Sequence, residues 1–186
     1  MCASNAHAGV SATNDSGGSG VWARGTPAGY FEGDVKVTGT ATIDGDIRLP
    51  GADCAEQFEV ADAQQLEPET VLVINEGGAL RESNEAYDRR VAGVISGAGE
   101  YRPGIVLGGA SHSEDRALVA VVGRAYCKVD ARQAPIELGD LLTTSATPGH
   151  AMRADDPVRA FGAVIGKALG PMSDGCGLIP MLVALQ

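Results

Sequence analysis

The stretch that decides the fold is Val35-Lys36-Val37-Thr38-Gly39-Thr40-Ala41-Thr42-Ile43-Asp44-Gly45-Asp46-Ile47-Arg48-Leu49. Apolar and polar residues alternate along it almost without a break, which is the period-two pattern of β-strands. Glycines at positions 33, 39 and 45 recur every six residues and reset the register. Each strand is therefore expected to be only about four or five residues long, too short to form an independent sheet within one chain.

Two arrangements would provide such short strands with hydrogen-bond partners and bury their apolar residues. In a β-stalk, identical chains wind around a shared axis and bury one another's apolar residues. In the alternative arrangement, the same residues form an ordinary three-stranded meander packed on the domain that follows. The stalk is the favoured interpretation, and it predicts that the trimer-interface residues are Val35, Val37, Ile43, Ile47 and Leu49.

The composition changes along the chain and predicts three parts. Residues 1–20 are rich in Ala, Ser, Gly and Asn and are expected to be a flexible lead-in. Residues 21–52 form the predicted β-stalk, and residues 53–186 form a head domain. Between Asp53 and Ala86 the head carries nine acidic residues and one basic residue, which indicates a solvated acidic face.

The head domain is predicted to be mainly β. Turn signals recur every 8–15 residues, which is the rhythm of an antiparallel barrel or sandwich. The best helix candidate is residues 83–90, at most about two turns long. The expected strands are residues 70–74, 91–96, 105–107, 117–129, 141–144, 161–166 and 178–185.

Charge and cysteine usage exclude several classes of protein. With 14 basic and 24 acidic residues the formal charge is 14 − 24 = −10, which argues against a nucleic-acid partner. The longest uncharged runs, such as residues 175–186, are shorter than the ~20 residues of a membrane helix, so no membrane insertion is expected. Cys2, Cys54, Cys127 and Cys176 form no CxxC pair, so neither a zinc ribbon nor a redox dithiol is indicated, and the thiols are expected to be buried or idle.

The sequence indicates no cofactor and no metal site. No phosphate-binding loop, dinucleotide fingerprint, HExxH or GxSxG motif is present. His7, His112 and His150 are scattered in polar, turn-like contexts typical of surface histidines.

A dense polar cluster, Gly51-Ala52-Asp53-Cys54-Ala55-Glu56-Gln57-Phe58, stands where the stalk meets the head. It resembles the Ser/Gly-Ala-Asp-Tyr-Ala-Glu motif that opens the intramolecular-chaperone autoproteolytic domain of phage neck appendages and tail spikes. Shorter similarities follow in residues 91–97, in Gly139-Asp140-Leu141-Leu142 and in Gly166-Lys167-Ala168-Leu169. The resemblance spans roughly residues 51–186, and the repeats upstream are similar to the shafts of such fibres.

This resemblance implies a homotrimer whose C-terminal domain brings three chains into register. In some members the domain then cuts itself away, using a serine at the junction and nearby acidic groups. Asp53 and Glu56 lie at the matching acidic positions. Position 51 is Gly where the cutting members carry Ser, and position 54 is Cys where they carry an aromatic residue. A non-cleaving relative is therefore expected, with Asp53 and Glu56 capping a turn and pairing with Arg48 or with an arginine of a neighbouring chain.

Three functions remain open at this point. The first is a structural module of a trimeric fibre, spike or appendage, which associates with itself and with other particle components. The second is a self-cleaving peptidase that cuts at the 50–56 junction, with Asp53, Cys54 and Glu56 as its catalytic residues. The third is a surface domain for a cell-surface ligand such as a glycan, with Tyr30, Phe31, Tyr87 and Tyr101 as stacking surfaces.

The sequence also predicts where the protein acts. The N-terminus has no basic start and no apolar block, so no signal peptide is expected. Synthesis in the cytoplasm and incorporation into a virion or a phage-derived extracellular particle is the expected route.

Overall fold

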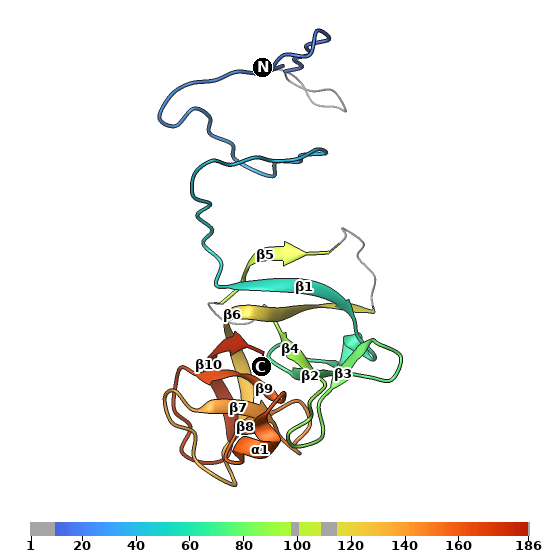
Figure 1. Cartoon of the computed structure of the whole chain (residues 1–186), viewed down its shortest axis with the longest axis vertical. Coiled ribbons are helices and arrows are strands. Elements are labelled where there is room, and N and C mark those ends of the chain that lie inside the picture. Colours follow the sequence, from blue (N-terminus) through green and yellow to red (C-terminus); the bar gives the residue numbers. More distant parts are fainter. Residues whose placement is uncertain (1–9, 98–100, 109–114, 186) are drawn as a thin grey trace. The chain divides into compact units, whose positions relative to one another are not determined.

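The computed structural model describes residues 10–97, 101–108 and 115–185 (Figure 1). The chain divides into two compact units, with the boundary between Ile47 and Arg48. The described part of the first unit, residues 10–47, contains no helix or strand, and all of its residues are exposed. One copy of the chain therefore does not pair the strands expected at 35–49, and the stalk stays a prediction about association between copies.

The second unit is mainly β, as expected, and strands make up 38% of the described residues against 4% for helix. The strands are β1 (Asp53–Glu59), β2 (Val71–Ile74), β3 (Leu80–Glu82), β4 (Val91–Ile95), β5 (Pro103–Leu107), β6 (Arg116–Asp130), β7 (Leu141–Thr144), β8 (Ala151–Arg153), β9 (Val164–Ala168) and β10 (Cys176–Ala184). The helical segments are a 3-10 turn at Ala63–Gln65 and the short helix α1 (Pro157–Ala160). Asp156 caps the start of α1, because its carboxylate accepts hydrogen bonds from the N–H groups of Val158 and Arg159.

Five strands close into a barrel, in the order β6–β10–β9–β7–β8 and back to β6. The longest contact is the antiparallel pair of β6 with β10, which runs in register from Asp130 opposite Cys176 to Val122 opposite Ala184. Closure depends on the parallel bridge between Val129 of β6 and Ala151 of β8. The expected barrel is thus confirmed.

The long strand β6 joins the barrel to a second layer of strands. Its N-terminal half pairs with β1 and β4, and its C-terminal half pairs with β10 and β8. β2 and β3 extend the sheet beyond β4, and β5 lies parallel to β1. β5 pairs with β1 alone, so its other edge is unpaired within the described chain (Figure 1).

Two hydrophobic clusters hold this unit together. The larger fills the barrel, where Leu142, Ile165 and Met181 are completely buried. The smaller lies between β1, β2, β4 and β6 around Leu72 and Val119. Val, Ile, Leu and Ala supply most of both clusters, as expected for a chain with 4% aromatic residues.

The structure corrects three sequence-based expectations. Residues 83–90 form turns rather than a helix, because Tyr87 adopts a left-handed φ of 62° and Asp88 N–H donates to Thr144 Oγ1. An isolated helix of about two turns lacks the length to offset its nucleation cost, so these tertiary contacts prevail. The strand expected at 161–166 begins only at Val164, because residues 161–163 form a turn. The polar cluster at 51–58 is not a turn, because β1 begins within it at Asp53.

Candidate functional site

The residues expected to bury one another between copies are exposed in the single chain. The side chains of Val35, Val37, Ile43, Ile47 and Leu49 are 63%, 57%, 54%, 63% and 46% exposed. Of these only Leu49 belongs to the second unit. Every residue from 35 to 49 is exposed, because this segment forms no strand in the single chain.

Asp53 opens β1 and is buried, with 6% of its surface exposed. Its Oδ2 accepts a 2.6 Å hydrogen bond from the Ser96 hydroxyl, whereas its Oδ1 is buried and has no hydrogen-bond partner among the described residues. Burial raises the pKa of this carboxyl, and the hydrogen bond from Ser96 opposes part of that rise. Neither Asp53 nor Glu56 forms an ion pair with Arg48 within the described chain, so the expected pairing inside one copy is wrong. Buried carboxyls favour hydrogen bonds from nearby hydroxyls when no cation reaches them.

Cys54 and Glu56 follow Asp53 on the same strand. Cys54 is half-buried and stands in register between Ile105 of β5 and Val122 of β6. Glu56 stands opposite Leu107 and Val119. The expected site residues all lie on β1, where successive side chains point to opposite faces of the sheet. Asp53 is buried against Ser96, a residue that sequence reasoning did not single out, whereas Cys54 and Glu56 are half-buried. No sequence spacing links positions 53 and 96, because a sheet contact joins them.

Gly51 stands where no side chain fits. A Cβ at this position would lie 2.1 Å from Gly104 Cα and 2.2 Å from Gly104 N. Beside this contact, Ala52 N–H donates to the Arg102 carbonyl at 2.8 Å, and the Ala52 carbonyl accepts from Arg124 N–H at 3.0 Å. The close approach of the two glycines gives a physical reason for Gly at position 51.

A hollow of about 270 Å³ lies beside these glycines. Its walls are nearly all apolar, and its one carboxyl is the buried Asp53. Leu49, Cys54, Ile105 and Val122 supply its largest side chains. This junction hollow therefore joins the last residue of the exposed apolar series to the face of β1, β5 and β6.

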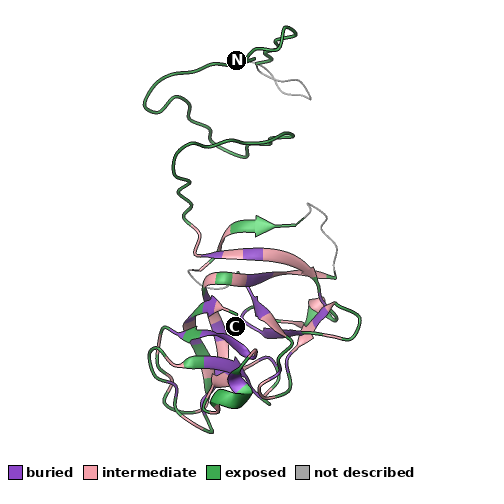
Figure 2. Ribbon diagram, in the orientation of Figure 1, coloured by how far each residue is buried: buried purple, intermediate pink, exposed green. Residues whose placement is uncertain are grey.

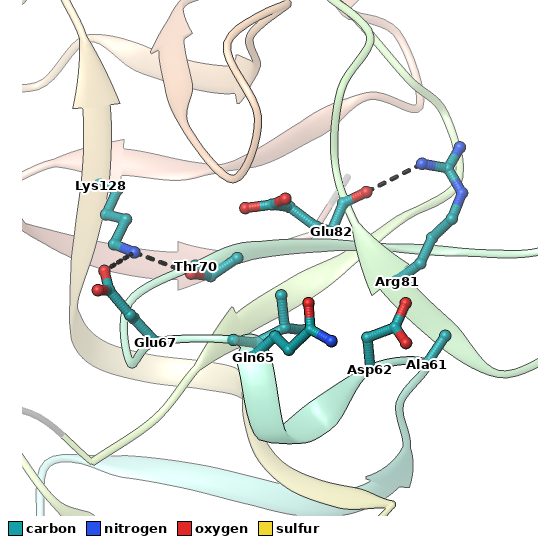
Figure 3. Close-up of a pocket in the computed structure, with 9 residues that line it drawn as sticks. Ala61, Asp62, Gln65, Glu67, Thr70, Arg81, Glu82 and Lys128 are labelled. Atoms are coloured by element: carbon teal, nitrogen blue, oxygen red, sulfur yellow. Dashed lines mark hydrogen bonds and ion pairs between the residues drawn. The ribbon is translucent and has the colours of Figure 1, made fainter.

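A larger cavity of about 390 Å³ is polar (Figure 3). Lys128 of β6 reaches into it and donates to Glu67 at 2.7 Å and to Thr70 at 3.1 Å. On its opposite side, Arg81 donates to the Glu82 carbonyl and to Asn84. The cations of this cavity thus already have protein partners, and part of the acidic stretch expected as a plain solvated face forms its wall.

Two Asp-x-Arg triplets brace the turns of the head. In each, the arginine's backbone N–H and guanidinium both donate to the aspartate two residues earlier: Arg90 to Asp88, and Arg132 to Asp130. Thr147 also donates to Asp130 at 2.6 Å. These bonds lower the pKa of both carboxyls. The repeated spacing is visible in the sequence, yet sequence reasoning did not single it out.

The aromatic residues expected as stacking surfaces have different surroundings. Tyr87 accepts hydrogen bonds from Asp155 N–H and Asp156 N–H, and its ring lies 4.3 Å beneath the Arg159 guanidinium. Tyr101 stacks on Tyr126 at 5.0 Å. Tyr30 and Phe31, in the first unit, are 82% and 76% exposed.

The remaining candidates divide between described and undescribed parts of the chain. His150 Nδ1 is 2.6 Å from the Pro148 carbonyl oxygen, whereas Cys2, His7 and His112 lie outside the described residues. Cys127 is buried and Cys176 exposed. Across the described ranges no three His, Cys, Asp or Glu side chains are grouped as metal ligands. The described helices are all too short or too polar to cross a bilayer.

Comparison with known proteins gives structural matches only. No protein-family model matches the sequence, and no curated protein matches it. The crystal structure of pre-mature bacteriophage phi29 gene product 12 matches with a TM-score of 0.58 at 16% identity, over 80% of this chain and 24% of that one. The C-terminal fragment of the same phage protein matches with a TM-score of 0.50 at 16% identity, over 71% of this chain and 100% of the fragment.

The chain thus spans about a quarter of the length of pre-mature gene product 12 and matches the whole of its C-terminal fragment. At this level of identity the match concerns the fold. This chain therefore shares the fold of the C-terminal part of a bacteriophage phi29 protein.

Proposed function

We propose that the protein is a structural module of a phage-like fibre, spike or appendage, and that it works as a homotrimer. Residues 35–49 of three copies bury one another's apolar side chains and bring the chains into register. The fold that the chain shares with a phage protein supports the part of this proposal that assigns it to a phage-like particle. The head then connects the trimer to other components of a virion or of a phage-derived particle.

The observation that carries the proposal is the exposed apolar series at 35–49. Val35, Val37, Ile43 and Ile47 are all more than half exposed, and the described part of the first unit has no strand to pair with. Each fully buried aliphatic side chain contributes about 1.5–3 kcal/mol. Burial in a trimer recovers this free energy for every copy, which gives three chains a reason to associate through this segment.

The mass of the particle in solution, measured by light scattering, tests the proposal. Three chains of 19.0 kDa predict about 57 kDa. The variant Ile43→Asp places a charge in the proposed interface and should shift the mass towards one copy. The control is Thr42→Asp, which adds the same charge at the neighbouring position. Because successive side chains of a strand point to opposite sides, this variant should remain a trimer. A wild-type chain that remains a single copy at high concentration contradicts the proposal.

A second candidate function is self-cleavage at the junction, and the contact of Ser96 with Asp53 favours it. The Ser96 hydroxyl donates a hydrogen bond to the buried Asp53 carboxyl, and a carboxylate in this position can act as the base that activates a hydroxyl nucleophile. In such a reaction the hydroxyl oxygen adds to a junction carbonyl, its proton passes through the carboxyl to the leaving amine, and water hydrolyses the resulting ester. Intact mass spectrometry decides this question. A fragment lacking about 50 residues in the wild type, and none in Ser96→Ala, supports cleavage, whereas an uncut wild-type chain contradicts it.

A further inference from the structure

The register of the sheet places a series of mostly apolar side chains across the head, interrupted by Lys167 between Leu182 and Leu141. Partners in a β-ladder point to the same face, so Ile105, Cys54, Val122 and Ala184 lie side by side across β5, β1, β6 and β10. Leu182 precedes Ala184 by two residues on β10 and therefore points to the same face. It stands opposite Lys167 of β9, which in turn stands opposite Leu141 of β7. We call Ile105, Cys54, Val122, Ala184, Leu182 and Leu141 the apolar strip.

The strip faces away from both hydrophobic clusters. Ile105 is 47% exposed, Val122 52%, Leu182 39% and Leu141 36%. On β7 and β10 the residue after each strip member is fully buried: Leu142 follows Leu141, and Val183 follows Leu182. Because successive side chains of a strand point to opposite faces, the strip lies on the outer face of the sheet. Figure 2 shows the exposed strand β5 at one end of this face.

A hollow lies at each end of the strip. The junction hollow, about 270 Å³, contains Cys54, Ile105 and Val122. The other hollow, about 220 Å³, contains Leu141, Leu182 and Ala184. Each chain therefore presents two different apolar hollows on one face. A ring of identical chains needs two different surfaces per copy, because each contact joins one surface to the other in head-to-tail fashion.

We infer that the apolar strip is a second self-association surface, separate from residues 35–47, on which a neighbouring copy of this chain packs. The inference rests on the proposed trimer, because Leu49 both ends the exposed series and lines the junction hollow. Chains that meet at Leu49 around a shared axis bring their junction hollows within reach of one another.

Two features of the strip favour a copy of the same chain as its occupant. Its six members are uncharged, and the charged residues in register with them, Arg124 opposite Leu182 and Lys167 between Leu182 and Leu141, are basic in a chain of net charge −10, so they attract rather than repel a copy of this acidic chain. Among the described residues the outer edge of β5 is unpaired and adjoins the strip, and such an edge beside apolar side chains is suited to backbone pairing with another chain. Lys167 stands in register between Leu182 and Leu141.

Cys54 is a natural reporter because it lies within the strip, and Cys176 is an exposed internal reference. The test is maleimide labelling of the full-length chain, followed by peptide mapping to read the rate at each cysteine. The variants are Ile105→Asn on the strip and Ile74→Asn on β2 as matched control, because Ile74 is 43% exposed and Ile105 47%. Asparagine is neutral, so neither variant adds a charge beside the reporter thiol.

We expect the rate at Cys54, relative to that at Cys176, to rise at least about tenfold in Ile105→Asn over the wild type, because an opened interface exposes the thiol. Leu182→Asn, at the other end of the strip, should have the same effect, and Ile74→Asn should have none. Equal rates in wild type and in both strip variants, in a particle of trimer mass, overturn this inference and leave the proposed function standing. A single-copy mass for the wild type overturns both.

Discussion

Gly51→Ser adds a side chain at the junction, and the structure predicts that the head accommodates it poorly. The new Cβ would stand 2.1 Å from Gly104 Cα, whereas ordinary contact begins near 3.4 Å. The two backbones must therefore separate by about 3.4 − 2.1 = 1.3 Å. A shift of that size breaks the 2.8 Å hydrogen bond from Ala52 N–H to the Arg102 carbonyl and opens the junction hollow.

The expected loss of stability follows from these contacts. One backbone hydrogen bond contributes about 1 kcal/mol, and overpacking costs about 1–3 kcal/mol, so Gly51→Ser should lower the free energy of unfolding by about 2–4 kcal/mol. For a unit of this size the midpoint of thermal unfolding should fall by roughly 8 °C.

Thermal unfolding followed by circular dichroism measures this change. The matched control is Gly77→Ser in the exposed turn between β2 and β3, where a Cβ would meet only Asn75 Oδ1, at 3.4 Å. A midpoint for Gly51→Ser within a degree or so of that of the control would show that the two glycines are not in the close contact described. Intact mass of the same variant shows in addition whether the added hydroxyl leads to cleavage.

Further predictions concern single groups in the head. Asp130→Asn should lower the free energy of unfolding at pH 7 by about 2 kcal/mol in denaturant titration, while the exposed Glu76→Gln should change it little. The pKa of Asp130 is lowered in the fold, so its stabilisation is present above the unfolded pKa and should be lost as the pH falls through the folded one. The pKa of Asp53 is raised, so its contribution has the opposite sign: wild-type stability should fall, relative to Asp53→Asn, as the pH rises from the unfolded to the folded pKa, and parallel curves would contradict this. Burial raises the pKa of the Cys127 thiol to about 12, so Cys127 should label far more slowly than Cys176 in the native state and at a similar rate in denaturant.

The strands of the head were largely predictable because their signals are local. Apolar runs bounded by glycine marked β2, β4, β6 and β10, each of which the structure contains. The helix expected at 83–90 failed because Tyr87 and Asp88 take their conformation from distant partners such as Thr144 and Asp155. No local pattern reports such contacts.

The sequence could single out residues at the junction but not the residues that surround them in the fold. The sequence singled out Asp53 and Cys54, yet the partners Ser96, Ile105 and Val122 lie 40 or more positions away and are joined to them by the sheet. The Gly51–Gly104 contact is of the same kind, because a glycine shows that a side chain is missing but not which neighbour excludes it.

The central claim is that three copies of the chain complete a structure that one copy leaves open, with residues 35–49 buried between them. Hydrogen exchange of the intact protein, read by mass spectrometry over these residues, tests it most directly. The account predicts slow exchange there in a particle of about 57 kDa, three times 19.0 kDa, and fast exchange once the particle is dissociated. Fast exchange over 35–49 in the intact particle would contradict it.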